Sequence, residues 1–228
     1  LLNATVNKIK LFETEEEKIF QSGKFFNVLN ITGIYSREVY MCKLLAEILN
    51  PKGSHAQHNI YVHLFCEKFL QDIPIDFNKV AIKLEVLTKE LDENRQQRRI
   101  DIVIDDGCYY IPIEVKINAY EQENQCRDYL EQVNEVYRKR NLTCPLILFF
   151  LTKDGHSPES VDNDGNGKVI NISWKDICEW LQVCIERSYE LKSPKNVINT
   201  LEQYKFAIEE FLETSGEKLM NNIESLLV

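Results

Sequence analysis

The segment RIDIVIDDGCYYIPIEVK, residues 99–116, is the centre of the predicted fold. Its first half alternates isoleucine with other residues, which is the period-two pattern of a strand. Asp106-Gly107 is a turn signal, and a second apolar run follows over residues 109–117. The segment therefore predicts an antiparallel hairpin that turns near Gly107.

The apolar residues of this hairpin indicate its register. When Ile102 is paired with Ile113, the apolar residues of both strands fall on one face, as a half-buried sheet requires. The same register pairs Ile104 with Ile111 and Ile100 with Val115. Asp101, Glu114 and Lys116 are left together on the opposite face, so we expect two carboxylates and one ammonium to converge there.

Two carboxylates a few ångströms apart repel each other unless a cation lies between them. Hard oxygen ligands select Mg²⁺ or Mn²⁺. Such an ion can polarise a phosphoryl oxygen and lower the pKa of a bound water. Lys116 could orient that water or neutralise charge that develops on a phosphate. The alternative is an ordinary Lys–Glu pair on a solvent-facing strand.

Hydrophobic periodicity on either side of the hairpin predicts an α/β fold with a mixed central sheet. Further strands are expected over residues 80–86, 146–151 and 169–172. Helices are expected over about 14–29, 36–49 with Ser36 as N-cap, 59–71, 121–140, from the cap at Ser173 onward, and after Pro194 to about Glu213. Because no linker or repeat divides the chain, we predict a single domain over 1–228. Its core would span about 36–175, and a helical part would follow over about 174–228.

Composition limits the classes of protein to which the chain can belong. The 228 residues are 44% hydrophobic and 28% charged, which is typical of a soluble globular protein, and no apolar run could span a bilayer. The seven cysteines are odd in number and irregular in spacing, which argues against a zinc site, an iron–sulfur site or a disulfide framework. We therefore expect reduced thiols in a cytoplasmic protein. The net charge of −9 counts against a nucleic-acid partner but does not exclude one.

The helix expected after the hairpin carries polar side chains on one face. Gln122, Gln125 and Tyr129 are spaced at i, i+3 and i+7, so they would lie together beside the end of the second hairpin strand. The alternative is a polar rim with Tyr129 in the core.

The order of these motifs resembles the PD-(D/E)XK nuclease superfamily, in particular its RecB-like branch and the uncharacterised bacterial families around it. The resemblance spans roughly residues 36–205. It is carried by RIDIVI (99–104), IEVK (113–116), QCRDY (125–129), LLAEILNP (44–51) with Glu38 before it and Gly53-Ser54-His55 after it, and FLTKDG (150–155). It implies a restriction-endonuclease-like core in which a helix, three antiparallel strands, a helix and a strand follow one another, with extra helices at both ends.

The resemblance also implies roles for individual residues. The metal, Mg²⁺ or Mn²⁺, would be bound by Asp101 and Glu114 with the main-chain carbonyl of Val115. Lys116 would be the catalytic lysine, and Glu38 would be an acid on a helix that completes or supports the metal site. Gln125, counted with the catalytic set, and Tyr129 would steady the site or the substrate, and Gln122 would lie with them.

The sequence departs from the family pattern in two places. Ile100 stands before Asp101 where proline is common in this branch, and Arg98 stands where related sequences often have glycine. The strand entry could therefore differ. The four-cysteine iron–sulfur pattern of some RecB-like nucleases is absent, so that cofactor is not implied.

Other residues are weaker candidates for contact with a substrate. His55 and Arg99 could each contact a phosphate, although an isolated histidine is commonly structural. The basic run 138–140 could bind a phosphate backbone or cap its helix. Residues 162–167 resemble half of an EF-hand loop but lack the glutamate at its twelfth position, so we expect a polar loop. Glu85 or Glu90 could join the metal site.

These observations lead to one hypothesis and two alternatives. The leading hypothesis is a magnesium-dependent nuclease that hydrolyses phosphodiester bonds, in DNA more than in RNA, by attack of a metal-activated water. The first alternative is a non-cleaving, nucleic-acid-binding or regulatory relative with the same fold. The second is an acidic protein-interaction domain whose carboxylates lie on the surface. The sequence does not indicate an oligomeric state.

Overall fold

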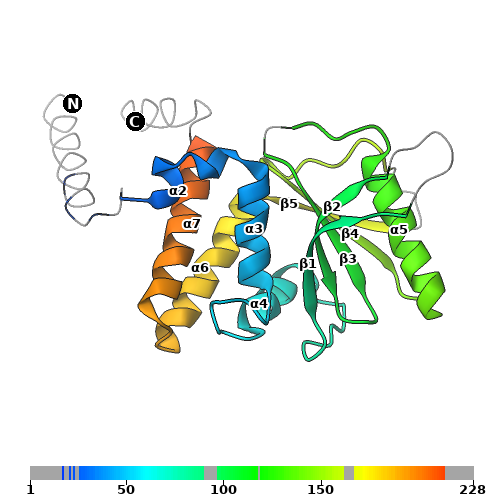
Figure 1. The fold of residues 1–228 in the computed structure, drawn as a ribbon, viewed down its shortest axis with the longest axis horizontal. Helices are drawn as coiled ribbons and strands as arrows, with labels where there is room; N and C mark the ends of the chain where they lie inside the picture. Colours follow the sequence, from blue (N-terminus) through cyan, green and yellow to red (C-terminus); the bar gives the residue numbers. More distant parts are fainter. Residues whose placement is uncertain are drawn as a thin grey trace, which may run out of the picture.

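A five-stranded mixed sheet forms the centre of the computed structural model (Figure 1). The structure describes residues 26–89, 97–117, 119–161 and 167–213, together with Glu17, Gln21 and Gly23. The strands lie across the sheet in chain order: β1 (Ala81–Leu87), β2 (Arg99–Asp105), β3 (Tyr110–Val115), β4 (Leu146–Thr152) and β5 (Gly167–Ser173). The first three are antiparallel, and β3, β4 and β5 are parallel to one another.

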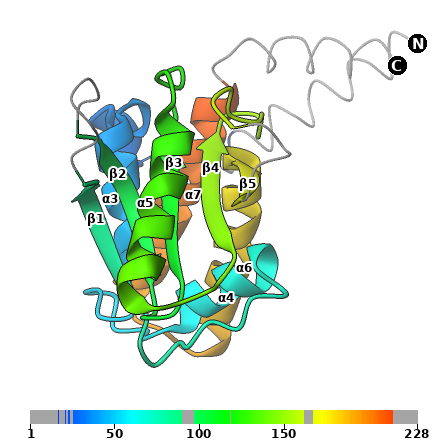
Figure 2. The same cartoon turned by 90° about the vertical axis from the view of Figure 1, so that its right-hand side faces the viewer.

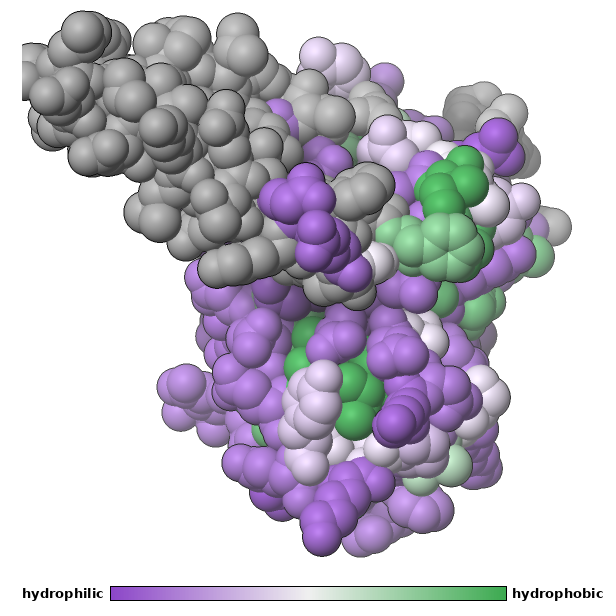
Figure 3. Space-filling model, turned by 90° about the vertical axis from the view of Figure 1, so that its left-hand side faces the viewer, coloured by the Kyte–Doolittle hydropathy of each residue, from purple (hydrophilic) through white to green (hydrophobic). Residues whose placement is uncertain are grey.

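Helices cover both faces of this sheet (Figures 1 and 2). One face carries α3 (Glu38–Leu49), α4 (Ile60–Phe69), α6 (Trp174–Glu190) and α7 (Lys195–Glu213), and α5 (Gln125–Arg140) covers the other. A short helix α2 (Val28–Ile31) and a 3-10 turn η1 (Ile34–Ser36) precede α3. The surface of the helical layer that points away from the sheet is mostly hydrophilic (Figure 3). The predicted mixed α/β fold with its helix–three strands–helix–strand core is confirmed.

Two predictions about the hairpin have different outcomes. The register is confirmed for Ile102 with Ile113 and for Ile104 with Ile111, whereas the predicted pair of Ile100 with Val115 is not among the pairs that the two strands form. The prediction that all apolar residues share one face is wrong for Ile100, which packs against the α5 layer while Ile102 packs against α3 and its neighbours. The change of face coincides with a local break in the pairing of β1 with β2, where Glu85 has a φ of 51° and neither Glu85 nor Asp101 is paired between Leu84–Ile102 and Val86–Ile100. The sheet is also covered on both faces at β3, whose residues are all buried.

Helix boundaries show where local patterns fall short. Ser36 is not the N-cap of α3, because it lies in η1 and its hydroxyl donates to the Gly33 carbonyl. The helix predicted from residue 121 begins only at Gln125. By contrast, Ser173 caps α6 in a capping box with Asp176, as expected. The helix predicted over 14–29 lies mostly outside the described residues.

None of the helices within the described residues is long and apolar enough to cross a bilayer.

Candidate active site

The hairpin brings two carboxylates and a lysine together at the C-terminal end of β3. The Lys116 ammonium lies 2.6 Å from Glu114 Oε1, and both residues are buried. Asp101 on β2 accepts a hydrogen bond of 2.9 Å from the Val115 main-chain N–H, which holds its carboxylate against β3. All three side chains line one cleft of about 730 Å³.

Glu38 reaches the same cleft from the first turn of α3. Its Oε2 accepts a hydrogen bond of 3.1 Å from the Ile117 main-chain N–H, just beyond the end of β3. The positive end of the α3 dipole favours a carboxylate at this position. A residue far from the hairpin in sequence thus adds a third carboxylate to the cleft wall.

Gln125 and Tyr129 form a rigid support behind Glu114. The Gln125 side-chain amide donates to Glu114 Oε1 over 2.6 Å and to the Tyr129 hydroxyl over 3.0 Å. The Tyr129 hydroxyl in turn donates to the Arg99 carbonyl over 2.9 Å. Because Tyr129 is fully buried, its position favours support of the site over contact with a substrate.

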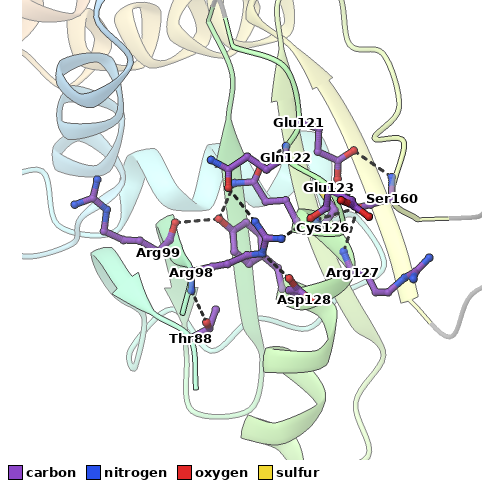
Figure 4. A network of polar contacts seen from close by, with 12 residues as sticks. Thr88, Arg98, Arg99, Glu121, Gln122, Glu123, Cys126, Arg127, Asp128 and Ser160 are labelled. Carbon is purple, nitrogen blue, oxygen red and sulfur yellow. Dashed lines mark hydrogen bonds and ion pairs between the residues drawn. The ribbon is translucent and has the colours of Figure 1, made fainter. Parts of the chain in front are cut away.

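A network around Arg98 joins the start of β2 to the start of α5 (Figure 4). Its guanidinium donates to the Asp128 carboxylate, to Gln122 Oε1 over 2.9 Å and to the Glu123 carbonyl. The Gln122 main-chain N–H donates to Gln125 Oε1 over 3.2 Å, which sets the orientation of the Gln125 amide. Gln122 therefore lies in the cleft on a loop, whereas the sequence pattern had predicted that it lies on the helix.

The role of Asp128 was missed by sequence analysis. This residue is fully buried, and its carboxylate receives the Arg98 guanidinium. The only signal was the arginine at a position where related sequences often have glycine. A glycine would leave the backbone freer at this position, whereas Arg98 supplies a positive charge that binds Asp128 and holds α5 in place.

The structure does not bring every candidate to the cleft. His55 lies beside a separate hollow, and both of its ring nitrogens are hydrogen-bonded, to the Asn50 carbonyl and the Gln57 N–H. Arg99 is exposed at the cleft and approaches Glu85 to 3.6 Å. In the basic run, Arg138 and Lys139 pair with Glu135, and Arg140 pairs with Asp105. Glu90 and most of the EF-hand-like loop lie outside the described residues.

The electrostatics of the cleft disfavour its negative charges. Burial raises the pKa of Asp101 to about 6, and the Glu38 charge adds to this while the Val115 N–H opposes it. Burial followed by repulsion from Asp101 raises the pKa of Glu114 to about 8, despite the nearby ammonium. Burial alone would lower the pKa of Lys116, but the ion pair with Glu114 outweighs it and the pKa is raised. The positive charge near the carboxylates of the cleft is thus too small to offset their burial and mutual repulsion.

The residues present fit a hard divalent cation. Glu114 Oε2 is buried and has no hydrogen-bond partner among the residues that the structure describes. The same part of the chain contains no ready-made group of three carboxylate, imidazole or thiol ligands, and Asp101 and Glu38 are each held by a main-chain N–H. An unsatisfied buried oxygen beside repelling carboxylates is the donor chemistry that Mg²⁺ and Mn²⁺ prefer.

Comparison with known proteins agrees with this geometry. Residues 26–213 match the family model of the PD-(D/E)XK nuclease superfamily. No curated protein and no solved structure gives a significant match. The RecB-like branch therefore stays a prediction from the motifs. Superfamily membership indicates a metal-dependent nuclease that acts on nucleic acid. The fold, the cleft and the matched residues together show that the chain belongs to the PD-(D/E)XK nuclease superfamily.

Proposed function

We propose that the protein hydrolyses phosphodiester bonds in DNA with Mg²⁺ or Mn²⁺. The observation that carries the proposal is Glu114 Oε2, a buried oxygen without a hydrogen-bond partner in the described part of the chain. Asp101, Glu114 and the Val115 carbonyl would hold the ion, with support from Glu38. A bound ion would supply Lewis-acid polarisation of the phosphate and a lowered pKa for water.

The remaining residues of the cleft would position the reactants. The Lys116 ammonium, which lies on the same wall as both carboxylates, would hold the attacking water or stabilise charge that develops on the phosphate. Gln125 would keep Glu114 in place through its 2.6 Å hydrogen bond. The exposed Arg99 would contact the nucleic-acid backbone at the cleft, where it would add affinity without sequence preference.

DNA is proposed as the substrate because the motifs resemble the RecB-like branch. We further propose that one domain spans the chain. Cytoplasmic location is proposed because all seven cysteines are free thiols, as expected in a reducing compartment.

A substrate panel tests the proposed function. The full chain is incubated with duplex, single-stranded and branched DNA and with RNA, in Mg²⁺, in Mn²⁺ and in a chelator. Metal-dependent cleavage of DNA that Asp101→Asn abolishes and Asp105→Asn retains would support the proposal. Cleavage of RNA but not of DNA would show that the proposed DNA substrate is wrong. Binding without cleavage in every metal would instead indicate a regulatory relative.

A further inference from the structure

Two cysteines lie in contact at the end of the sheet away from the cleft. Cys108 is exposed in the turn between β2 and β3, and Cys144 lies just before β4. Their sulfur atoms are 3.3 Å apart, although the residues are 36 positions apart in the chain. All seven cysteines are described, and the other five are buried. This is therefore the accessible thiol pair of the protein.

The backbone supports a bond between these two sulfurs. β3 and β4 pair in parallel with Ile113 opposite Phe149, and Cys108 and Cys144 each lie five residues before this pair, in the segments that lead into the two strands. The two sulfur atoms are already 3.3 Å apart, so they need to approach by only about 1.2 Å to reach the disulfide bond length of about 2.05 Å. Little backbone movement would be needed.

Hydrogen bonds hold both segments in place. Asp106 Oδ1 accepts from the Cys108 N–H over 2.9 Å. The Tyr137 hydroxyl accepts from the Tyr110 N–H over 3.2 Å and reaches the Pro145 carbonyl over 3.5 Å, so it links the residues that follow each cysteine. The thiols are thus held near each other by groups that do not depend on the sulfur atoms.

We propose that Cys108 and Cys144 form a reversible disulfide when the protein meets hydrogen peroxide. The Cys108 sulfur attacks one peroxide oxygen, the O–O bond breaks, and one water leaves to give a sulfenic acid. The Cys144 sulfur then attacks the Cys108 sulfur, the S–O bond breaks, and the second water carries away the Cys144 proton. A dithiol reductant returns both thiols by exchange.

The choice of Cys108 as the first thiol follows from its exposure. Burial, together with the hydrogen bond to Cys108, raises the pKa of Cys144 to about 11, which makes it the slower nucleophile and the resolving partner. Burial raises the pKa of Cys66 and of Cys178 to about 12, so these thiols react more slowly still. The peroxide is therefore expected to react first with the exposed Cys108, and Cys144 is expected to form the disulfide because it lies in contact with Cys108.

The disulfide would brace the elements that carry the cleft residues. The loop that it closes contains β3 and α5, and hence Glu114, Lys116 and Gln125. The turn at Cys108 precedes β3 whereas the cleft lies at the end of that strand, so the bond would not cover the cleft. Closing such a loop restricts the unfolded chain, and we expect the thermal midpoint to rise by roughly 5–10 °C.

The test treats the full chain with stoichiometric hydrogen peroxide and then maps its disulfides by proteolysis and mass spectrometry. We expect wild type to lose two thiols, to give a Cys108–Cys144 peptide and to recover both thiols with a dithiol reductant. Cys178→Ser, a matched control at a buried cysteine, should behave in the same way. Cys108→Ser and Cys144→Ser should give no such peptide and no rise in thermal midpoint.

Three results would overturn the proposal. The first is conversion of Cys108 to sulfinic acid in wild type without the cross-linked peptide. The second is a product that joins two chains, seen on a non-reducing gel. The third is a cross-link that forms only after the protein is denatured. A thermal midpoint that does not rise on oxidation would overturn the bracing effect. None of these readouts depends on nuclease activity, so the test is independent of the proposed function.

Discussion

Asp101 and Asp105 lie four residues apart on the same strand, β2, yet their surroundings differ in kind. Asp105 is buried and receives hydrogen bonds of 2.8 Å from both Lys83 and Arg140. Burial alone would raise the pKa of Asp105, but these cations outweigh it and lower the pKa to about 2. Asp101 has one main-chain N–H and two neighbouring carboxylates, and its pKa is raised to about 6.

The charge of Asp105 therefore stabilises the folded protein, whereas the charge of Asp101 destabilises it. At Asp105 the protein supplies the positive charge from its own side chains. At Asp101 and Glu114 a single ammonium from Lys116 faces the carboxylates, and one buried oxygen is left without a hydrogen bond within the described residues. Strongly perturbed carboxylates that share a cleft are typical of functional sites. The missing positive charge is what a divalent cation would bring.

The largest expected contrast is in cleavage. Asp101→Asn should lower metal-dependent DNA cleavage by at least about 1,000-fold, because it would remove a proposed metal ligand and its charge. Asp105→Asn should keep cleavage within about tenfold of wild type, because that residue lies outside the cleft. Initial rates at saturating Mg²⁺ on protein shown to be folded by circular dichroism measure both. Equal losses in the two variants would contradict the comparison.

The next contrast is in the pH dependence of stability without metal. Because the pKa of Asp101 is about 6 when folded against an ordinary value of 3.8, its ionisation favours the unfolded state. Stability is fully present below about pH 4 and is lost as the pH rises through 6. Asp101→Asn should therefore match wild type near pH 4 and exceed it near pH 8 by up to roughly 3 kcal/mol. Urea unfolding in chelator at both pH values measures this, and a variant that is less stable at pH 8 would show a structural role instead.

Asp105 should show the opposite sign. Its pKa is lowered from 3.8 to about 2, so its contribution is present above about pH 4 and is lost as the pH falls toward 2. Asp105→Asn should cost about 1–3 kcal/mol at pH 7, since two partly exposed cations lose a charged partner. Urea unfolding at pH 7 and pH 3 measures this cost, which should shrink at the lower pH. A cost that is unchanged between the two would argue against linkage.

The smallest effect is expected for the network that holds α5 in place. Arg98→Lys keeps the charge but loses the fork that contacts Asp128, Gln122 and the Glu123 carbonyl at once. We expect about a tenfold fall in cleavage with little change in substrate affinity, because Gln125 would hold Glu114 less well. Arg127→Lys, at an exposed position on α5, is the matched control. Equal effects of the two would remove the positioning role.

Local patterns predicted the elements, whereas long-range contacts decided the details. The register of the hairpin and the cap at Ser173 depend on neighbouring residues, and both were predicted from the sequence. The face of Ile100 was not, because the pairing of β2 with its neighbour β1 is interrupted at Asp101 and Glu85, which no local pattern reveals. The start of α5 was also predicted too early in the chain. Arg98, just before β2, donates hydrogen bonds to Gln122 and to the Glu123 carbonyl and holds these residues in a loop.

The candidate site was predicted to a similar extent. Alternation along the strands placed Asp101, Glu114 and Lys116 on one surface, and the family resemblance added Glu38. The buried anchor at Asp128 required contacts between β2 and α5, which no local spacing reveals. The contact between Cys108 and Cys144 likewise joins two segments that are distant in the chain, the one before β3 and the one before β4. Irregular cysteine spacing gave no sign of it.

Calorimetric titration of the metal-free protein with Mn²⁺ tests the central claim most directly, because it does not depend on a substrate. The account predicts saturable binding to wild type and to Asp105→Asn, and its loss in Asp101→Asn and in Glu114→Gln. Binding should also weaken as the pH falls below about 8, where Glu114 becomes protonated, and weaken further below about 6, where Asp101 does. Absence of binding to wild type, or equal binding to Asp101→Asn, would contradict the claim that this end of β2 is built to hold a divalent cation.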